Sequence, residues 1–318
     1  MAVGSPAASQ VLVRRTLSRG GFDWRSAAFS AFLLFCLVFA LAVIAVLIAQ
    51  VTIRGMPVLT DRGADFLTSN LSTRAGTAGV GQGIFGSLFI ALFVIILAIP
   101  IGVMTAIYLE EYAPDNRLTR FIAINIRNLA GVPSVVYGLL GLAVFVPVTR
   151  VIESVIFPDL DGTGRSIVAA SITLSALVLP IVIITASESI RAVPGTIREA
   201  GYGAGASRWQ VTRSLVLPSA IPGILTGTIL SVSRALGETA PLIIIGVSYN
   251  FFSTGNRGTL EGLFGPYTAL PAIVYGWASN PELDFRELTA AAIVVLLAVT
   301  LFANAVAILL RNRYEIKW

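Results

Sequence analysis

Six long apolar stretches constrain this chain more than any other feature of its sequence. A helix needs roughly 20 mostly apolar residues to cross the hydrocarbon core of a bilayer. Only 12% of the residues are charged, whereas soluble domains contain about 25%. The sequence therefore predicts an all-α, polytopic membrane protein with six transmembrane helices. The stretches cover about residues 27–53, 84–109, 121–147, 166–187, 219–247 and 288–310.

Four prolines fall inside or near the ends of these stretches, namely Pro100, Pro133, Pro180 and Pro241. A proline removes one backbone donor, but neighbouring helices in a membrane bundle can satisfy the carbonyl groups that it frees. We therefore expect kinked helices at these positions rather than breaks.

The basic residues predict how the chain crosses the membrane. Arginine and lysine are retained on the cytoplasmic side of membrane proteins. With the N-terminus inside, most of the 22 basic residues fall on the cytoplasmic side, so both termini are expected in the cytoplasm. The domain organisation expected from this is a cytoplasmic segment over 1–26, a membrane domain over 27–310 and a cytoplasmic tail over 311–318.

Several chemistries are excluded by residues that the sequence lacks. Histidine is absent and Cys36 is the only cysteine, so we expect no catalytic residues, no metal site and no cofactor. The only lysine is Lys317, so a phosphate-binding loop of the form GxxxxGK[ST] is impossible. The basic residues form no patch with interleaved aromatics, which argues against nucleic acid. If ATP drives this protein, another chain binds it.

A cytoplasmic loop over 188–218 joins the fourth and fifth apolar stretches and is longer than a simple connection. Thr196 and Glu199 have the spacing of a capping box, which predicts a helix that starts near Ile197. A second short helix is expected from about Ser207 to Val216. It would stop at Pro218.

This loop resembles the EAA signature of ABC-importer permeases, in which E-A-A is followed by three residues, G, nine residues and I-x-L-P. The chain has Gly201 for the second Ala and Leu215 for Ile. The matching residues at the family spacing are Glu199, Ala200, Gly205, Leu217 and Pro218. The resemblance implies that these residues and Leu215 contact a separate ATPase. The alternative is an amphipathic helix that lies on the lipid headgroups.

Three further strings resemble the phosphate-specific ABC importer permeases: Tyr108–Pro114, Asn128–Gly138 and Ser233–Pro241. The last one, which ends in Glu-Thr-Ala-Pro, is similar to the PstA-type subunit rather than to the PstC-type subunit. The resemblance implies the type I ABC importer permease fold and a bacterial inner (plasma) membrane location. It implies four kinds of partner: a PstC-like second permease, a dimer of PstB-like ATP-binding subunits, a PstS-like phosphate-binding protein and membrane lipid.

Charged residues inside apolar stretches are the candidates for the substrate pathway, because charge in a bilayer is costly. Arg234 and Glu238 lie four residues apart, so they are expected to share a helix face and to form an ion pair. Arg234 lies roughly 24 Å along a helix from Pro218, too far to reach the cytoplasmic surface. Arg127 is a second candidate. Alternatively, the Arg234–Glu238 pair only stabilises helix packing. For Arg127, the alternative to a place in the pathway is a position at the membrane surface.

Inorganic phosphate is the cargo expected from this resemblance, and the chain itself is expected to be no enzyme. A permease for sulfate, molybdate or another oxyanion would share the EAA segment and is the first rival. A secondary transporter or channel would not need that segment, and a membrane scaffold would have no use for Arg234 and Glu238.

Overall fold

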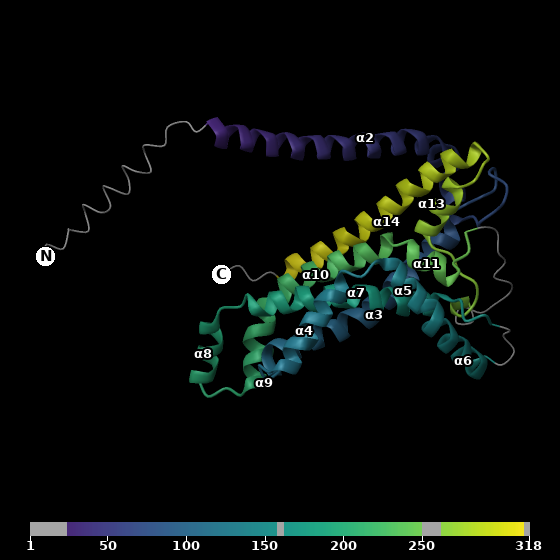
Figure 1. Ribbon diagram of the computed structural model, residues 1–318. Helices are drawn as coiled ribbons and strands as arrows, with labels where there is room; N and C mark the ends of the chain where they lie inside the picture. Colours follow the sequence, from purple (N-terminus) through teal and green to yellow (C-terminus); the bar gives the residue numbers. More distant parts are fainter. Residues whose placement is uncertain (1–23, 158–161, 250–261, 315–318) are drawn as a thin grey trace. The chain divides into compact units, whose positions relative to one another are not determined.

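The computed structural model describes residues 24–157, 162–249 and 262–314, and every regular element in this part of the chain is helical (Figure 1). The α-helices are α2 (Trp24–Thr68), α3 (Gly81–Ile107), α4 (Arg117–Ala130), α5 (Ser134–Leu140), α6 (Val146–Ile156), α7 (Ile167–Arg191), α8 (Gly195–Gly203), α9 (Arg208–Val211), α10 (Leu217–Gly237), α11 (Ala240–Ile245), α13 (Leu270–Ala278) and α14 (Asp284–Tyr314). Three single π-turns join them: η1 (Tyr108–Tyr112), η2 (Gly141–Phe145) and η3 (Thr212–Val216).

Six membrane spans are present among the described residues, as predicted. Each is long and apolar enough to cross a bilayer. Their limits are Trp24–Thr68, Gly81–Tyr112, Ser134–Ile156, Ile167–Arg191, Arg208–Gly237 and Asp284–Arg313. The all-α fold is therefore confirmed.

The chain divides into two compact units, residues 1–53 and residues 54–318. The described part of the first unit is the apolar beginning of α2, whose side chains are exposed along its length. In the second unit α2 continues through Pro57 and bends at Gly63, which has φ 43°. A residue with a Cβ rarely adopts that conformation, so the bend depends on glycine.

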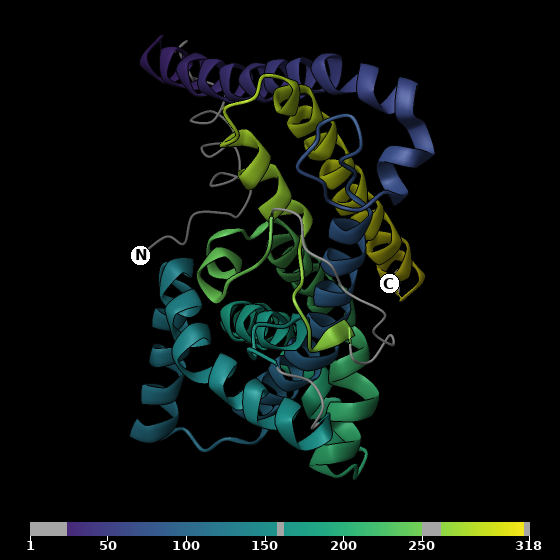
Figure 2. The same ribbon diagram turned by 90° about the vertical axis from the view of Figure 1, so that its right-hand side faces the viewer.

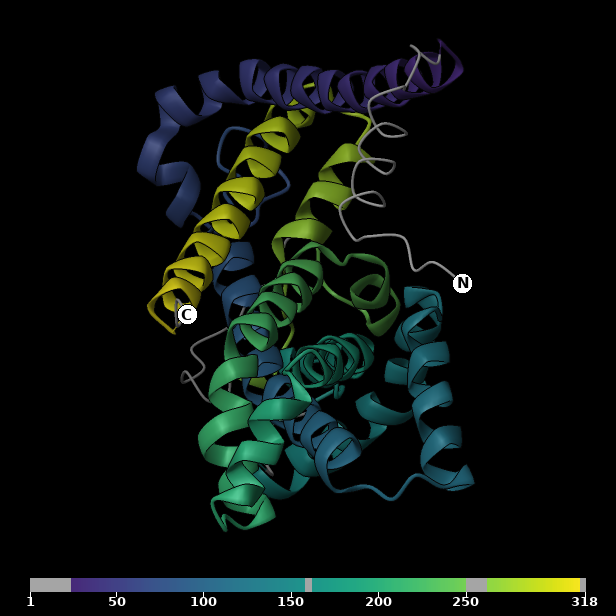
Figure 3. The ribbon, with the colours of Figure 1, turned by 90° about the vertical axis from the view of Figure 1, so that its left-hand side faces the viewer.

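Helix α7 is the centre of the second unit, and the views along it show α3, α10, α5 and α6 around it (Figures 2 and 3). In the most apolar stretch of 18 residues within α7, 67% of the residues are buried inside the chain. A helix that is apolar on all sides requires such an environment. Gly102 of α3 and Gly227 of α10 face Val182 and Thr185 of α7 at distances that leave no room for a side chain. Small residues thus bring these spans together, as is common in membrane bundles.

The expectation that the helices do not break is confirmed at Pro100 and Pro180, which lie inside continuous helices. It is wrong at Pro133 and Pro241. Pro133 lies between α4 and α5 with ψ 137°, and Pro241 lies in the first turn of the separate helix α11. A proline disfavours the helical conformation of the residue before it and cannot donate to the preceding turn, so a new helix starts there.

These breaks correct the limits of two predicted spans. The third span does not cover 121–147, because residues 117–130 form a separate helix and the span runs over Ser134–Ile156. The fifth does not run from 219 to 247, because it extends from Arg208 to Gly237. Residue Glu238 follows it with ψ 123°, an extended conformation.

Candidate functional site

The loop after α7 folds into an elbow, which we define as α8, α9 and η3 (Figure 1). Two helical parts were predicted there and both are present, but their limits differ. Helix α8 begins at Gly195 after Pro194, without a side-chain cap, so the predicted capping box of Thr196 and Glu199 is wrong. The capping box lies at the start of α9, where Gln210 N–H donates to Ser207 Oγ and Ser207 N–H donates to Gln210 Oε1.

The second helical part does not stop at Pro218. It continues through η3 into α10, where Pro218 occupies the first turn. The π-turn η3 directly precedes α10, and such local π adjustments allow a proline inside a membrane helix because they re-satisfy the backbone groups that it frees. The elbow is therefore continuous with the fifth span, so any movement of α9 is also a movement of that span.

The residues of the EAA signature take two kinds of position. Glu199 and Ala200 are exposed on α8, whereas Leu215, Leu217 and Pro218 are partly buried at the start of the fifth span. Leu215 and Pro218 line a cavity of about 590 Å³ beside the end of α7. The exposed pair is thus free to contact another protein, and the apolar residues join the elbow to the membrane helices.

Gly205 lies at the joint between α8 and α9 and has φ 81°. We expect Gly205→Val to weaken ATPase binding, because a left-handed conformation costs a side-chain-bearing residue about 1–2 kcal/mol and the joint would change its angle. The effect is measured as the affinity of the variant permease complex for its ATPase. Gly203→Val is the control, since Gly203 has open space around it and an ordinary φ. Equal affinities for the two variants would contradict the prediction.

The two departures from the EAA signature contact one another. A Cβ added at Gly201 would lie 2.8 Å from Leu215 Cδ1 and 2.8 Å from a methyl of Val211. Gly201 is buried, so the larger reach of Leu215 fills the space that an alanine methyl would use. Leu215 and Val211 therefore leave little room for a side chain at Gly201.

We therefore expect Gly201→Leu to destabilise the elbow by about 1–3 kcal/mol, the usual cost of overpacking. Adding Leu215→Ala should recover much of this loss, because it vacates the space that the new side chain needs. Limited proteolysis of the loop over 188–218 in the purified complex measures the local stability. A double variant that is cleaved as fast as the single one would show that the two positions do not share space.

An apolar cluster beneath the elbow joins three spans. It contains Ala106 from the second span, Ile190 from the fourth and Val216 at the elbow, all buried. Val193, Val211, Ala220 and Ile224 belong to the same cluster. The elbow therefore has a core of its own, shared with the ends of these spans.

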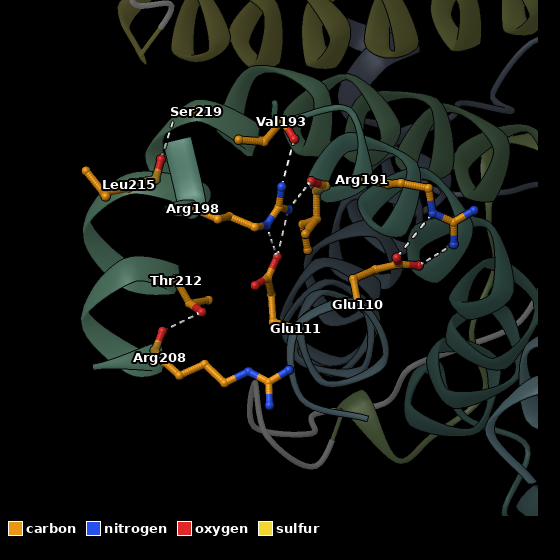
Figure 4. A network of polar contacts seen from close by, with 10 residues as sticks. Glu110, Glu111, Arg191, Val193, Arg198, Arg208, Thr212, Leu215 and Ser219 are labelled. Carbon is orange, nitrogen blue, oxygen red and sulfur yellow. Dashed lines mark hydrogen bonds and ion pairs between the residues drawn. The ribbon is translucent and has the colours of Figure 1, made fainter. Parts of the chain in front are cut away.

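A buried ion pair lies beside this cluster (Figure 4). Arg198 of α8 donates from Nη2 and Nε to Glu111 Oε1, at 2.8 and 3.1 Å. The Glu111 side chain is only 4% exposed and that of Arg198 is 22% exposed. Arg198 also donates to the carbonyls of Val193, at 2.7 Å, and Ile190, at 2.9 Å. A buried charge is costly unless it is paired and hydrogen-bonded. The Glu111 carboxylate is paired with Arg198 and accepts two of its four hydrogen bonds.

The residues on either side of Glu111 make similar contacts. Arg191 forms a forked ion pair with Glu110, at 2.7 and 3.2 Å, and the Arg208 guanidinium lies 5.3 Å from the centre of the Tyr112 ring. Consecutive residues of η1 therefore hold the end of α7, α8 and α9. Sequence reasoning missed this network, because its ion-paired residues lie 81 and 87 residues apart. The adjacent carboxylates of Glu110 and Glu111 were the available signal.

Arg234 and Glu238 form the ion pair that the sequence predicts, with Nε to Oε1 at 3.1 Å. The geometry differs from the prediction, because α10 ends at Gly237 and the pair spans the helix end rather than one helix face. The Arg234 side chain is 42% exposed within this chain, so an anion has room to approach the guanidinium. Beside it, Ser233 hydrogen-bonds Asn304 of α14, which fixes this part of α10 against the last span.

Arg127 does not lie with this pair. It is exposed in the last turn of α4, a helix with no buried residue. There it lines a cavity of about 180 Å³ together with three acidic side chains, Glu110, Asp115 and Glu188. Among the described residues, the structure thus separates the two arginines that the sequence placed in one pathway.

Comparison with known proteins gives one family. Residues 98–316 match the model of the family described as "Binding-protein-dependent transport system inner membrane component". The chain is 33% identical over 233 residues to "Phosphate transport system permease protein PstA 1" of Mycobacterium tuberculosis, covering 73% of this chain and 70% of that protein. It is 33% identical over 208 residues to "Probable ABC transporter permease protein YqgI" of Bacillus subtilis, with 65% of this chain and 66% of that protein covered.

Solved structures agree on the fold. A bacterial ABC transporter involved in the import of the acidic polysaccharide alginate has a TM-score of 0.54 at 15% identity, covering 93% of this chain and 98% of that chain. The MetNI methionine ABC transporter has a TM-score of 0.51 at 17% identity, and the match covers 75% of this chain and 95% of that chain.

Six spans and an elbow with the EAA spacing define a type I ABC importer permease. It is a multi-pass inner membrane protein that performs no bond chemistry itself, since ATP is hydrolysed by a separate subunit. This chain belongs to the family of binding-protein-dependent transport system inner membrane components.

Proposed function

We propose that this chain is the permease subunit of an ATP-driven importer of inorganic phosphate. The observation that carries the proposal is the Arg234–Glu238 ion pair at the end of the fifth span, after residues 217–233 of α10, which carry no charge. Intramembrane charge marks a substrate pathway by default, because burying it in lipid is costly. The name of the Mycobacterium tuberculosis relative supports phosphate as the cargo.

Phosphate suits the chemistry of this pair. It carries one to two negative charges near neutral pH and prefers the planar, forked donors of a guanidinium. Arg234 gives the anion a transient partner during passage, while Glu238 holds the arginine in place. The carboxylate also keeps the anion from binding too tightly to leave, which conduction requires. Arg127, at its separate cavity, is a second candidate for an anion contact.

The elbow is the contact for the ATPase. Glu199 and Ala200 are exposed on α8, and Gly205 sets the angle between α8 and α9. Closure of an ATPase dimer moves the elbow, and the fifth span moves with it because Leu215, Leu217 and Pro218 lie on a continuous helix. Alternating access of a cavity between two permeases follows as a rigid-body movement.

The partners follow from the same proposal. A PstC-like permease completes the pathway, two PstB-like subunits bind the elbows, and a PstS-like protein delivers phosphate from outside. Both termini lie in the cytoplasm, which agrees with the excess of basic residues there. Chemical labelling of cysteines placed at Trp24 and Arg313 in sealed cells tests this orientation.

Phosphate-stimulated ATP hydrolysis tests the proposal. The complex of both permeases, the ATPase and the binding protein is reconstituted in vesicles and supplied with phosphate, sulfate or molybdate. We expect phosphate alone to stimulate hydrolysis and to accumulate inside. Stimulation by sulfate or molybdate, with none by phosphate, would favour the rival oxyanion permease. Phosphate uptake that follows an ion gradient without ATP would contradict an ABC importer.

A further inference from the structure

The elbow is attached to a span that is not its neighbour in sequence. Residues 188–218 join the fourth and fifth spans, so the connection alone transmits movement to those two. Glu111, which pairs with Arg198 of the elbow, belongs to the end of the second span. The attachment is formed by side chains and would not exist without the tertiary fold.

Two independent features make this attachment rigid. Arg198 makes four hydrogen bonds, two to Glu111 and one each to the carbonyls of Val193 and Ile190. The apolar cluster beneath packs Ala106 of the second span against residues of the fourth span and of the elbow. Polar and apolar contacts therefore hold the same parts together.

We propose that Arg198 and Glu111 are positioning residues that make the elbow and the cytoplasmic end of the second span move as one body during transport. The movement imposed by the ATPase then reaches the second, fourth and fifth spans together. Arg191–Glu110 contributes little, because Arg191 is largely exposed and water weakens exposed ion pairs. The inference rests on the proposed ATPase contact of the elbow, but it does not depend on which anion is carried.

A distance measurement tests the shared movement without any transported anion. Spin labels are placed on exposed residues in a Cys36→Ser background of the assembled complex. The first pair, Met104→Cys in α3 and Tyr202→Cys in α8, lies within the proposed body. The second pair, Tyr202→Cys and Val155→Cys in α6, connects that body to another part of the chain.

On ATP binding we expect the first distance to stay constant and the second to change by more than about 2 Å, the scale of helix shifts in switching proteins. A change in the first distance overturns the proposal. No change in the second also overturns it, because the elbow then does not move. Neither result bears on the identity of the cargo, which the ATPase assay with phosphate, sulfate and molybdate decides separately.

A coupling assay then assigns the effect to the ion pair. Glu111→Gln keeps the shape of the side chain and removes its charge. We expect the number of anions transported per ATP hydrolysed to fall by about fivefold or more, the range of typical coupling effects, with ATP hydrolysis retained. Glu287→Gln is the matched control, because Glu287 is exposed in the first turn of α14 and the change is the same. An unchanged ratio in Glu111→Gln overturns the role of the pair, as does an equal fall in Glu287→Gln.

Discussion

Replacing Arg234 with glutamine is expected to reduce phosphate uptake at least about tenfold. A charge-assisted hydrogen bond is worth about 1.5–3 kcal/mol, and 1.4 kcal/mol corresponds to a factor of ten. Arg234→Gln keeps a long polar side chain but removes both the charge and the forked donor. Uptake into reconstituted vesicles at fixed ATP measures the change, and copurification of all subunits shows that the complex still assembles.

Two further variants separate the roles of charge and shape at this position. Arg234→Lys keeps the charge without the planar fork, so we expect uptake between that of the wild type and that of Arg234→Gln. Arg313→Gln removes an exposed arginine in the last turn of α14, and it should leave uptake unchanged. If Arg234→Gln transports at the wild-type rate, the pair with Glu238 only packs helices and does not contact the anion.

Replacing Arg198 with alanine is expected to lower the free energy of unfolding by about 3 kcal/mol, the lower end of the range for breaking a buried ion pair. The Glu111 carboxylate would stay almost fully buried without its cation. Two carbonyls, those of Ile190 and Val193, would lose their donor as well. Unfolding of the purified permease complex in detergent, followed by heat or denaturant, measures the loss.

Arg191→Ala is the matched control. It removes the same atoms from the ion pair with Glu110, the residue next to Glu111. The Arg191 side chain is 61% exposed, so the expected loss is below about 1 kcal/mol. The double variant Arg198→Met and Glu111→Leu should recover much of the loss, since apolar residues of similar volume can replace a buried pair. The carbonyls of Ile190 and Val193 still lose their donor. Equal losses for Arg198→Ala and Arg191→Ala would show that burial does not strengthen the Arg198 pair.

The six spans and the all-α class could be predicted because they depend on length and hydropathy along the chain. A lipid environment leaves a backbone few options, so an apolar stretch of sufficient length becomes a helix. The positive φ of Gly205 was predictable for a similar reason, because only glycine adopts that conformation without strain. The Arg234–Glu238 pair was predictable from a spacing of four residues.

The breaks at Pro133 and Pro241 were not predictable with the same rules. Pro100 and Pro180 stay inside helices, and Pro180 is buried in the central span. The sequence shows four prolines in apolar surroundings, but only the packing around each one determines whether neighbouring groups satisfy the freed carbonyls. The limits of the third and fifth spans were wrong for this reason.

The Arg198–Glu111 pair depends on the fold alone. No local spacing relates two residues that are 87 positions apart, so nothing along the chain marks Glu111 as the partner of Arg198. The contact between Gly201 and Leu215 is similar, since each looks like an independent departure from the family signature until both are seen in one packed elbow.

The sequence by itself determined that this chain lies in a membrane, lacks the GxxxxGK[ST] loop of nucleotide-binding proteins and carries a segment with the EAA spacing. These properties follow from hydropathy, from the position of the only lysine and from a spaced motif, all of which act along the chain. The tertiary structure decided which spans that segment is joined to. The burial of a carboxylate and the pairing of distant residues arise only when separate helices exclude water together.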